Sequence, residues 1–339
     1  METSLIQQYT AKDFKSDQYV RWCPGCGDYA VLNTLQKVMA ELGGAPHNTA
    51  VISGIGCSSR LPYYISGYGF HTIHGRGAAV ATGVKVANPK LTVWQITGDG
   101  DCLAIGGNHF IHSVRRNIDI NVLLFNNQIY GLTKGQYSPT TKKGYVTKSS
   151  PFGTIERPFR PAELTFGAGG TFFGRVLDVD LKSSAMTMMA AAKHKGTSVI
   201  ETLVNCVIFN DGAHGWLSEK ETRYDRVIIL EHGKPMIFGK NSDKGLVAEG
   251  FNLKVVTIGE NGVTENDVLV HDAQCQDSTL QLKLALMEGP EYPVALGVIR
   301  DVATESYDEA MENQIAEIQA KAKIKTFDDL IDSCEQWDM

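Results

Sequence analysis

Two turns in the sequence combine acidic and amide side chains with glycine, a combination typical of a metal–diphosphate site. Gly98-Asp99-Gly100 follows an apolar stretch, and Asn126-Asn127 follows the next apolar stretch after 25 intervening residues. A hard divalent ion prefers oxygen ligands and often keeps phosphate oxygens among them. Asp99 and Asn127 each offer such an oxygen, and the free N–H groups that open the helix near Leu103 can receive a diphosphate. The alternative is a pair of ordinary polar turns.

Four cysteines form a second candidate centre. The Cys23-x-x-Cys26 pair is compatible with a zinc half-site, a redox dithiol or half of an iron–sulfur site. No second such pair and no paired histidines are present for zinc, and no predicted strand precedes the pair as a thioredoxin-like motif requires. Cys57 and Cys206 stand singly at the ends of two predicted strands. Four thiolates from three segments form the ligand set of a 4Fe–4S cluster.

The three other cysteines carry no comparable spacing. We expect Cys102, Cys275 and Cys334 to be small buried apolar residues. Cys102 follows the Gly-Asp-Gly-Asp turn and is a competitor of Cys206 for the fourth cluster position. Cys206 is favoured because a thiolate at Cys102 would compete with the diphosphate for the same N–H donors.

Alternating strands and helices must position these residues. The predicted strands cover residues 49–53, 91–97, 120–125 and 198–204, and the predicted helices cover residues 28–42, 77–87, 103–116 and 181–194. Apolar strands alternating with helices predict an α/β fold with a doubly wound, mainly parallel sheet. Ligands of such sheets bind beyond the carboxyl ends of the strands, where the Gly-rich turns fall. Residues 134–161 have no clear period and predict a functional or interface loop.

The pattern changes near residue 216. We therefore predict a domain over residues 1–215 that holds both candidate centres and a C-terminal α+β extension over residues 216–339. The extension has a predicted hairpin over residues 227–238 and helices that begin near Tyr307 and Phe327. It is acidic, and the sequence assigns it no role.

Composition narrows the class of protein. The 339 residues are 43% hydrophobic and carry a formal net charge of −6, and neither half is basic enough to predict nucleic-acid binding. No apolar run reaches the length of a membrane span, and the first 20 residues lack the pattern of a signal peptide. Sparse cysteines without an export signal favour a reducing compartment, and we expect a cytoplasmic protein.

Five motifs in a fixed order connect the two centres to a known family. They are Cys-Pro-Gly-Cys-Gly, Gly-Ile-Gly-Cys-Ser-Ser, His-Thr-Ile-His-Gly-Arg, Gly-Asp-Gly-Asp and Asn-Asn-x-Ile-Tyr-Gly-Leu-Thr. Over about residues 20–240 the chain resembles the β subunits of 2-oxoacid:ferredoxin oxidoreductases, most of all those of the 2-oxoglutarate branch. The residues after about 240 are less diagnostic of this family.

The resemblance implies a role for each motif residue. It implies that Asp99, Asn127 and the carbonyl of Ile129 bind Mg²⁺. It implies a 4Fe–4S cluster on Cys23, Cys26, Cys57 and Cys206. The residues that it places around thiamine diphosphate are Ile55, Gly56, Cys57, Ser58, His74, Gly98, Gly100, Asp101, Gly131 and Leu132.

Two residues are candidates for a catalytic role. Arg60 lies on the loop expected to face the thiamine ring, where a guanidinium can grip the distal carboxylate of 2-oxoglutarate. The alternative for Arg60 is a contact with a partner chain only. His74 lies in the His-Gly-Arg context of the family, and the alternative for this side chain is a structural histidine.

The implied reaction is the CoA-dependent oxidative decarboxylation of 2-oxoglutarate to succinyl-CoA and CO₂, with reduction of ferredoxin. In reverse it fixes CO₂. An obligate α subunit is implied, because the chain has room for the diphosphate module but not for the module that activates the aminopyrimidine, and an (αβ)₂ assembly is expected. Three alternatives stay open: pyruvate or another 2-oxoacid as substrate, half of a non-redox decarboxylase or carboligase, and a zinc-stapled interaction module.

Overall fold

A single eight-stranded sheet forms the centre of the protein. The computed structural model describes residues 8–335. The strands of the sheet are β1 (Thr49–Ser53), β2 (Tyr68–His71), β3 (Thr92–Gly98), β4 (Asn121–Asn126), β5 (Phe172–Leu177), β6 (Ser198–Leu203), β7 (Val227–Leu230) and β11 (Val294–Asp301). Their order is β2-β1-β3-β4-β6-β5-β11-β7. Strands β1 to β6 are parallel, whereas β11 is antiparallel to β5 and parallel to β7. The predicted α/β fold with a mainly parallel sheet is confirmed.

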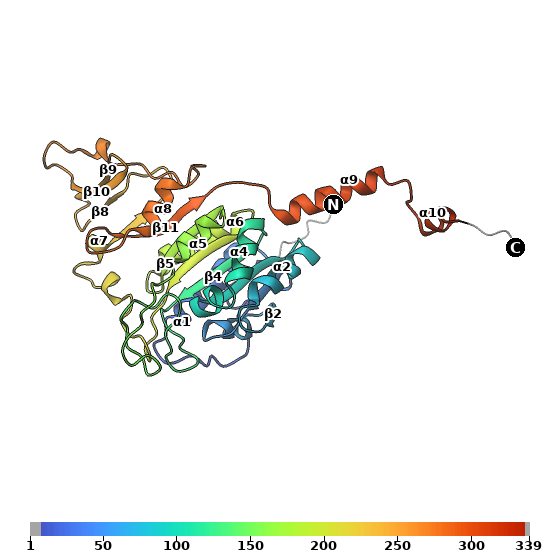
Figure 1. The fold of residues 1–339 in the computed structure, drawn as a ribbon, viewed down its shortest axis with the longest axis horizontal. Coiled ribbons are helices and arrows are strands. Elements are labelled where there is room, and N and C mark those ends of the chain that lie inside the picture. Colours follow the sequence, from blue (N-terminus) through green and yellow to red (C-terminus); the bar gives the residue numbers. More distant parts are fainter. Residues whose placement is uncertain (1–7, 336–339) are drawn as a thin grey trace.

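Helices cover both faces of this sheet (Figure 1). The helices that pack on it are α1 (Asp28–Glu41), α2 (Gly77–Ala87), α4 (Gly107–Arg116), α5 (Pro161–Gly167), α6 (Leu181–Lys193) and α8 (Thr279–Leu286). One core cluster joins α1 and α6 to the sheet, and another joins α2, α4, α5 and α8 to it. In β4, Val122 and Leu124 belong to one cluster and Leu123 and Phe125 to the other. Successive strand side chains point to opposite faces, so a strand buried on both sides is apolar throughout.

The predicted helix over residues 103–116 is two helices. Helix α3 (Asp99–Leu103) begins directly after β3, and α4 begins at Gly107. The break falls at Gly106, where a Cβ would lie 2.3 Å from the carbonyl oxygen of Asp101 and 3.1 Å from the Cα of Gly75. Only glycine lets these backbones approach so closely. The N–H groups next to the Gly-Asp-Gly turn therefore belong to α3, and the expectation that they open the Leu103 helix was wrong.

The C-terminal part joins the main sheet and also builds a second one. The predicted hairpin over residues 227–238 is wrong, because β7 pairs with β11 whereas β8 (Ile237–Phe238) pairs with β9 (Lys244–Glu249). With β10 (Asn252–Thr257), β8 and β9 form an antiparallel three-stranded sheet. The main sheet thus continues beyond residue 215, since β11 covers the edge of β5. The division into domains at that residue stays a prediction.

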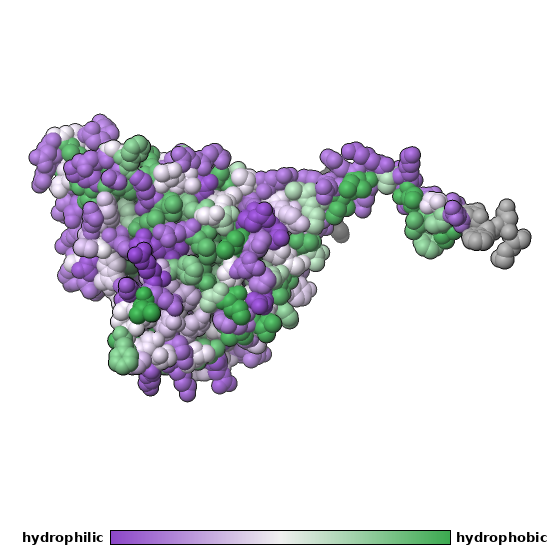
Figure 2. All heavy atoms as spheres, in the orientation of Figure 1, coloured by the Kyte–Doolittle hydropathy of each residue, from purple (hydrophilic) through white to green (hydrophobic). Residues whose placement is uncertain are grey.

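The chain ends in an arm that leaves the body. Helix α7 (Arg223–Arg226) precedes β7, and the arm carries α9 (Tyr307–Lys321) and α10 (Phe327–Asp332), which confirms the two predicted terminal helices. The arm extends away from the sheet (Figure 1) and carries hydrophobic and hydrophilic side chains along its length (Figure 2). None of the helices between residues 8 and 335 combines the length and the apolar character needed to cross a membrane.

Candidate active site

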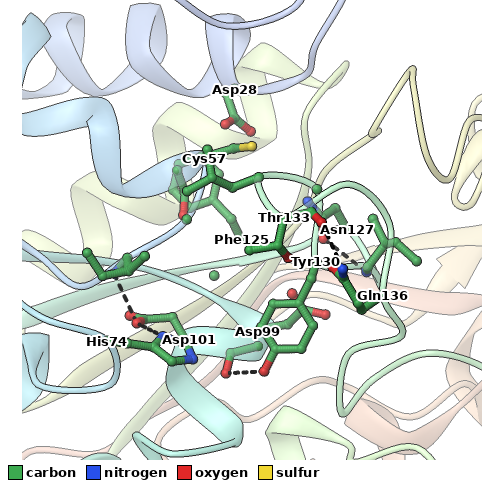
Figure 3. Close-up of a pocket in the computed structure, with 18 residues that line it drawn as sticks. Asp28, Cys57, His74, Asp99, Asp101, Phe125, Asn127, Tyr130, Thr133 and Gln136 are labelled. Carbon is green, nitrogen blue, oxygen red and sulfur yellow. Dashed lines mark hydrogen bonds and ion pairs between the residues drawn. The ribbon is translucent and has the colours of Figure 1, made fainter. Parts of the chain in front are cut away.

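A cavity of about 530 Å³ opens at the carboxyl edge of β1, β3 and β4 (Figure 3). Because β3 pairs in parallel with both β1 and β4, the turns that follow the three strands meet at this edge. The cavity is lined by every residue that the resemblance places at thiamine diphosphate or magnesium. These residues are Ile55, Gly56, Cys57, Ser58, His74, Gly98, Asp99, Gly100, Asp101, Asn127, Ile129, Gly131 and Leu132.

Asp101 ties the turns together. Its Oδ1 accepts hydrogen bonds from the backbone N–H groups of Ile55 and Gly75, at 3.0 and 2.7 Å, and its Oδ2 accepts one from the hydroxyl of Thr97 at 2.8 Å. A Cβ on Gly54 would lie 1.9 Å from the Asp101 carboxylate, so this position requires glycine. Both carboxylate oxygens are thus occupied by the protein. Asp101 shapes the cavity.

Unlike Asp101, Asp99 uses only one of its carboxylate oxygens for hydrogen bonds to side chains. Its Oδ2 accepts hydrogen bonds from the hydroxyls of Ser138 and Thr140, at 2.6 and 2.5 Å. The side chain is 3% exposed, and burial raises the pKa of its carboxyl to about 6 although both hydroxyls lower it. Ser138 and Thr140 belong to the long loop between β4 and α5, so this loop positions a candidate metal ligand. Sequence reasoning assigned the loop a function without identifying these two residues.

The turn after β4 completes the cavity. The Oδ1 of Asn127 accepts a hydrogen bond from the backbone N–H of Ile129 at 3.1 Å, which folds the turn back on itself. Tyr130 donates its hydroxyl to the carbonyl of Gly100 at 3.0 Å, and a Cβ on Gly100 would lie 2.2 Å from the Tyr130 ring. The ring closes over the Gly-Asp-Gly turn. Burial, together with Asp99 and Asp101, raises the pKa of Tyr130 to about 12, so this phenol stays protonated at neutral pH.

His74 is held by the same carboxylate that organises the turns. Its Nδ1 lies 2.8 Å from the Oδ1 of Asp101, and the imidazole is 41% exposed. Nδ1 makes the contact with Asp101, and Nε2 is the ring nitrogen left for a ligand. The Asp101 contact and the place of His74 in the cavity lining fit a polar group held ready for a ligand.

The three segments that carry the four predicted cluster cysteines lie beside the cavity. A Cβ on Gly131 would lie 3.5 Å from the Sγ atoms of both Cys57 and Cys206, so these two thiols flank one glycine. Burial is the main cause that raises the pKa of the Cys26 thiol, and the neighbouring Asp28 carboxylate and the thiols of Cys57 and Cys206 raise it further. Burial also raises the pKa of Cys57 to about 12, and the neighbouring Cys23 thiol raises it further.

Backbone and side-chain contacts hold the cysteine segments together. The indole of Trp22 donates to the carbonyl of Cys57 at 2.7 Å, which joins the Cys-x-x-Cys segment to the loop after β1. The backbone N–H of Gly27 donates to the carbonyl of Asn205 at 3.3 Å, which joins that segment to the chain beyond β6. The three segments that carry the four predicted cluster cysteines are therefore neighbours, and the ligand set itself stays a prediction.

The other cysteines lie elsewhere. Cys102 is 3% exposed in the core cluster that contains α2 and α4. The expectation that Cys275 and Cys334 are buried was wrong, because both are exposed in the C-terminal part. Arg60 does not line the cavity, although its charge lowers the pKa of Cys57 and it therefore lies near that thiol. All seven cysteines are free thiols.

Comparison with known proteins identifies the family. Residues 54–202 match the family described as thiamine pyrophosphate enzyme, C-terminal TPP binding domain. The chain is 49% identical to the 2-oxoglutarate oxidoreductase subunit KorB of Mycobacterium tuberculosis over 91% of this chain and 82% of that one. This chain belongs to the family of 2-oxoacid:ferredoxin oxidoreductase β subunits. The predicted family is confirmed, and the β subunit is part of a thiamine diphosphate-dependent oxidoreductase.

Two further relatives extend the similarity. Subunit β of 2-oxoacid:ferredoxin oxidoreductase 1 from Aeropyrum pernix is 46% identical over 58% of this β subunit and 62% of its own length. A solved structure of 2-oxoglutarate:ferredoxin oxidoreductase from Magnetococcus marinus, with 2-oxoglutarate, coenzyme A and succinyl-CoA bound, is similar with a TM-score of 0.76. That chain is 29% identical, and the match covers 97% of both chains.

Sequence reasoning missed several residues that line the cavity of this β subunit. They are Asp28, Phe125, Tyr130, Thr133 and Gln136. Asp28 is the first residue of α1, and Gly27 is its N-cap residue. Its carboxyl is 3% exposed and points toward Cys57 (Figure 3). Burial raises the pKa of Asp28 to about 7. Its place in the Cys-Pro-Gly-Cys-Gly-Asp run was the sequence feature that could have identified it.

Proposed function

We propose that the β subunit holds thiamine diphosphate through Mg²⁺ on Asp99, Asn127 and the carbonyl of Ile129. The observation that supports this proposal is the shared cavity at the ends of β3 and β4, where a buried carboxylate and an amide lie beside the Gly98-Asp99-Gly100 turn. Because Ser138 and Thr140 both donate to Oδ2 of Asp99, Oδ1 is the oxygen left for a metal ion. Hard oxygen donors of this kind suit Mg²⁺.

A 4Fe–4S cluster on Cys23, Cys26, Cys57 and Cys206 is the second part of the proposal. Within residues 8–335, no three His, Cys, Asp or Glu side chains are arranged to hold one metal ion. A zinc staple needs ligands that converge on one point, whereas each cysteine of a cluster binds a different iron atom at the corner of a cube. The gap at Gly131, flanked by two thiols, leaves space that any side chain would fill. The two thiols beside Gly131, together with the family of the chain, support the cluster over the zinc module.

The proposed reaction is the CoA-dependent oxidative decarboxylation of 2-oxoglutarate with ferredoxin as electron acceptor. When bound, thiamine diphosphate would supply carbanion chemistry and a 4Fe–4S cluster would supply one-electron transfer. The residues of the chain would hold and orient these groups: Asp101 fixes the turns, Tyr130 covers the Gly98-Asp99-Gly100 turn, and His74 lines the cavity. Cys57 lies in both the cavity and the cysteine group, which supports a short path for electrons.

The assembly is part of the same proposal. An α subunit completes the thiamine site, two αβ pairs associate, and the complex works in the cytoplasm. Relatives named as β subunits support the need for an α partner. Arg60 lies outside the cavity lining, so a grip on the distal carboxylate of 2-oxoglutarate requires a substrate site completed by that partner.

Anaerobic co-expression with the α subunit tests the proposal. We expect about four iron atoms per β subunit and viologen reduction that requires both 2-oxoglutarate and CoA. The β subunit alone should have no turnover. Asp99→Ala should keep the iron but lower the affinity for thiamine diphosphate by at least about tenfold, since even metal second-shell changes commonly cost that much. One zinc and no iron, or full turnover by the β subunit alone, would contradict the proposal.

A further inference from the structure

The C-terminal arm leaves an apolar stripe uncovered along α9. Met311, Ile315 and Ile318 follow one another at the i, i+4, i+7 spacing that places side chains on one face of a helix. Ile315 and Ile318 are 43% and 63% exposed, and every residue of α9 from position 312 onward is exposed (Figure 2). Helices in proteins owe most of their stability to the packing of such a face. The stripe therefore indicates a binding surface.

Hydrogen bonds at the root of the arm fix its direction. The amide of Asn117 donates to the hydroxyl of Thr304 at 3.0 Å and to the carbonyl of Glu305 at 3.1 Å. The backbone N–H of Asp119 donates to the carboxylate of Asp308 at 3.0 Å. From this root α9 runs away from the body, so its stripe does not fold back on its own chain (Figure 1). A fixed root also lowers the entropy that is lost when the arm binds a partner.

A groove beside the root of the arm has an apolar floor. It has a volume of about 590 Å³, and Met186, Met189 and Ala190 of α6 line it together with Ala303, where the arm begins. Met186 is 50% exposed although it lies on a helix that packs on the main sheet. Methionine side chains are flexible and adapt to the shape of a partner. The groove thus offers the outer face of α6 to an apolar helix.

Charge favours a second copy of the same chain as the partner. Residues 303–339 contain 10 acidic and 3 basic residues. Helix α6 contains Lys182 and Lys193 and no acidic residue, and neither lysine has an ion pair within residues 8–335. The one carboxylate in the groove lining, that of Asp301, already contacts His194 at 2.8 Å. An acidic arm and a basic groove on one chain are complementary between two copies.

We propose that the β subunits of two αβ pairs exchange arms, so that α9 of each copy lies in the groove on α6 of the other. Ala303 at the start of the arm also lines the groove, so a twofold axis beside the two roots allows both arms to make the same contacts. Ile315 and Ile318 pack on the methionines, and Glu312 beside the stripe faces the lysines of α6. This inference rests on the proposed (αβ)₂ assembly and names the surfaces that join its two β subunits.

Sedimentation of the co-expressed complex at several concentrations tests the stripe. In Ile315→Ser/Ile318→Ser each copy loses two large aliphatic side chains from the interface. We therefore expect the dissociation constant of (αβ)₂ into αβ pairs to rise at least about tenfold. Ala316→Ser/Ala320→Ser introduces the same residues on the opposite face of α9 and should associate like wild type. Equal dissociation constants of the isoleucine variant and wild type, or a complex with a single β subunit in every protein, overturn the inference.

Charge reversal tests the contact with α6. Lys182→Glu/Lys193→Glu and Glu309→Lys/Glu312→Lys should each raise the same dissociation constant about tenfold, because like charges then face each other. The four substitutions combined in one chain should restore association. A combined variant that associates no better than the two double variants overturns the inference.

A photo-cross-linker identifies the partner of the arm. In a complex with two differently tagged β subunits, p-benzoylphenylalanine replaces Ile318. We expect cross-linked peptides that join the arm of one tagged β subunit to residues 181–193 of the other. A cross-link to the α subunit or within one β subunit overturns the inference. If that complex still binds thiamine diphosphate and reduces viologen, the proposed reaction stands and only the arm exchange fails. A wild-type complex that binds no thiamine diphosphate contradicts the proposed function itself.

Discussion

The hydroxyl of Thr140 donates to the carboxylate of Asp99 at 2.5 Å, across 41 residues of sequence. Both side chains are only 3% exposed. The same hydroxyl lies 2.9 Å from the Oδ1 of Asn126. Thr140 therefore connects the turn after β3 to the end of β4, and it fixes the direction in which Asp99 presents its other oxygen.

Removing this hydroxyl should weaken the metal site. In Thr140→Val the Asp99 carboxylate loses one of two hydroxyl donors, so its orientation is less restricted and its pKa rises. We expect the affinity for thiamine diphosphate at limiting Mg²⁺ to fall about tenfold or more. Titrations at several Mg²⁺ concentrations measure this effect. Thr140→Ser, which keeps the hydroxyl, serves as the control and should bind like wild type. Equal affinities of the valine and wild-type proteins would show that Asp99 does not need Thr140.

The fourth cluster ligand can be tested with two cysteine variants. Cys206 and Cys57 flank Gly131, whereas Cys102 is buried in the core cluster around α2 and α4. We expect Cys206→Ala to lose or degrade the cluster, and Cys102→Ala to keep both iron and activity within a few-fold of wild type. Iron and sulfide analysis, with paramagnetic resonance of the reduced cluster, measures this on protein prepared without oxygen. Cluster loss in the Cys102 variant with retention in the Cys206 variant would reverse the assignment.

The buried carboxyl of Asp28 should make the iron-free protein less stable as pH rises. Burial raises its folded pKa from 3.8 to about 7, so the folded chain binds more protons than the unfolded chain between these values. Stability then falls with rising pH in this window, by about 1.4 kcal/mol per unit of pKa difference at most. Asp28→Asn cannot ionise, so its melting temperature should fall less between pH 5 and pH 8. The exposed Asp17→Asn is the control and should follow wild type. Identical pH profiles of the Asp28 variant and wild type would refute this account.

Substrate preference should depend on Arg60. A guanidinium can pair with the distal carboxylate of 2-oxoglutarate, which pyruvate lacks. We expect Arg60→Ala to lower the ratio of kcat/KM for 2-oxoglutarate to that for pyruvate by about tenfold, and the exposed Arg157→Ala to leave the ratio unchanged. Steady-state assays of the αβ complex with both substrates give this ratio. If Arg60→Ala lowers both efficiencies equally, Arg60 acts at the subunit interface instead.

Local sequence determined much of the fold and of the thiamine site. Apolar runs of strand length, followed by Gly98-Asp99-Gly100 and Asn126-Asn127, predicted β3, β4 and the edge where a ligand binds. These features can be predicted because a strand and the turn that follows it depend mainly on residues close to them in the sequence. The parallel pairing of β3 and β4 then places both turns together. The residues that the family motifs place at thiamine diphosphate also line this cavity.

Tertiary structure alone decided the contacts between distant segments. Strands β1 and β6 are separated in the sheet by β3 and β4, yet Cys57 and Cys206 meet at Gly131 because the loops after these strands bend toward each other. The loop that carries Ser138 and Thr140 has no helix or strand period, so nothing in its sequence shows that it folds onto Asp99. In the same way, the local pattern predicts a hairpin for β7, but β11 pairs with both β5 and β7, so both strands belong to the main sheet. Long-range packing of this kind depends on which surfaces remain to be covered once the local elements have formed, and a local pattern does not contain that information.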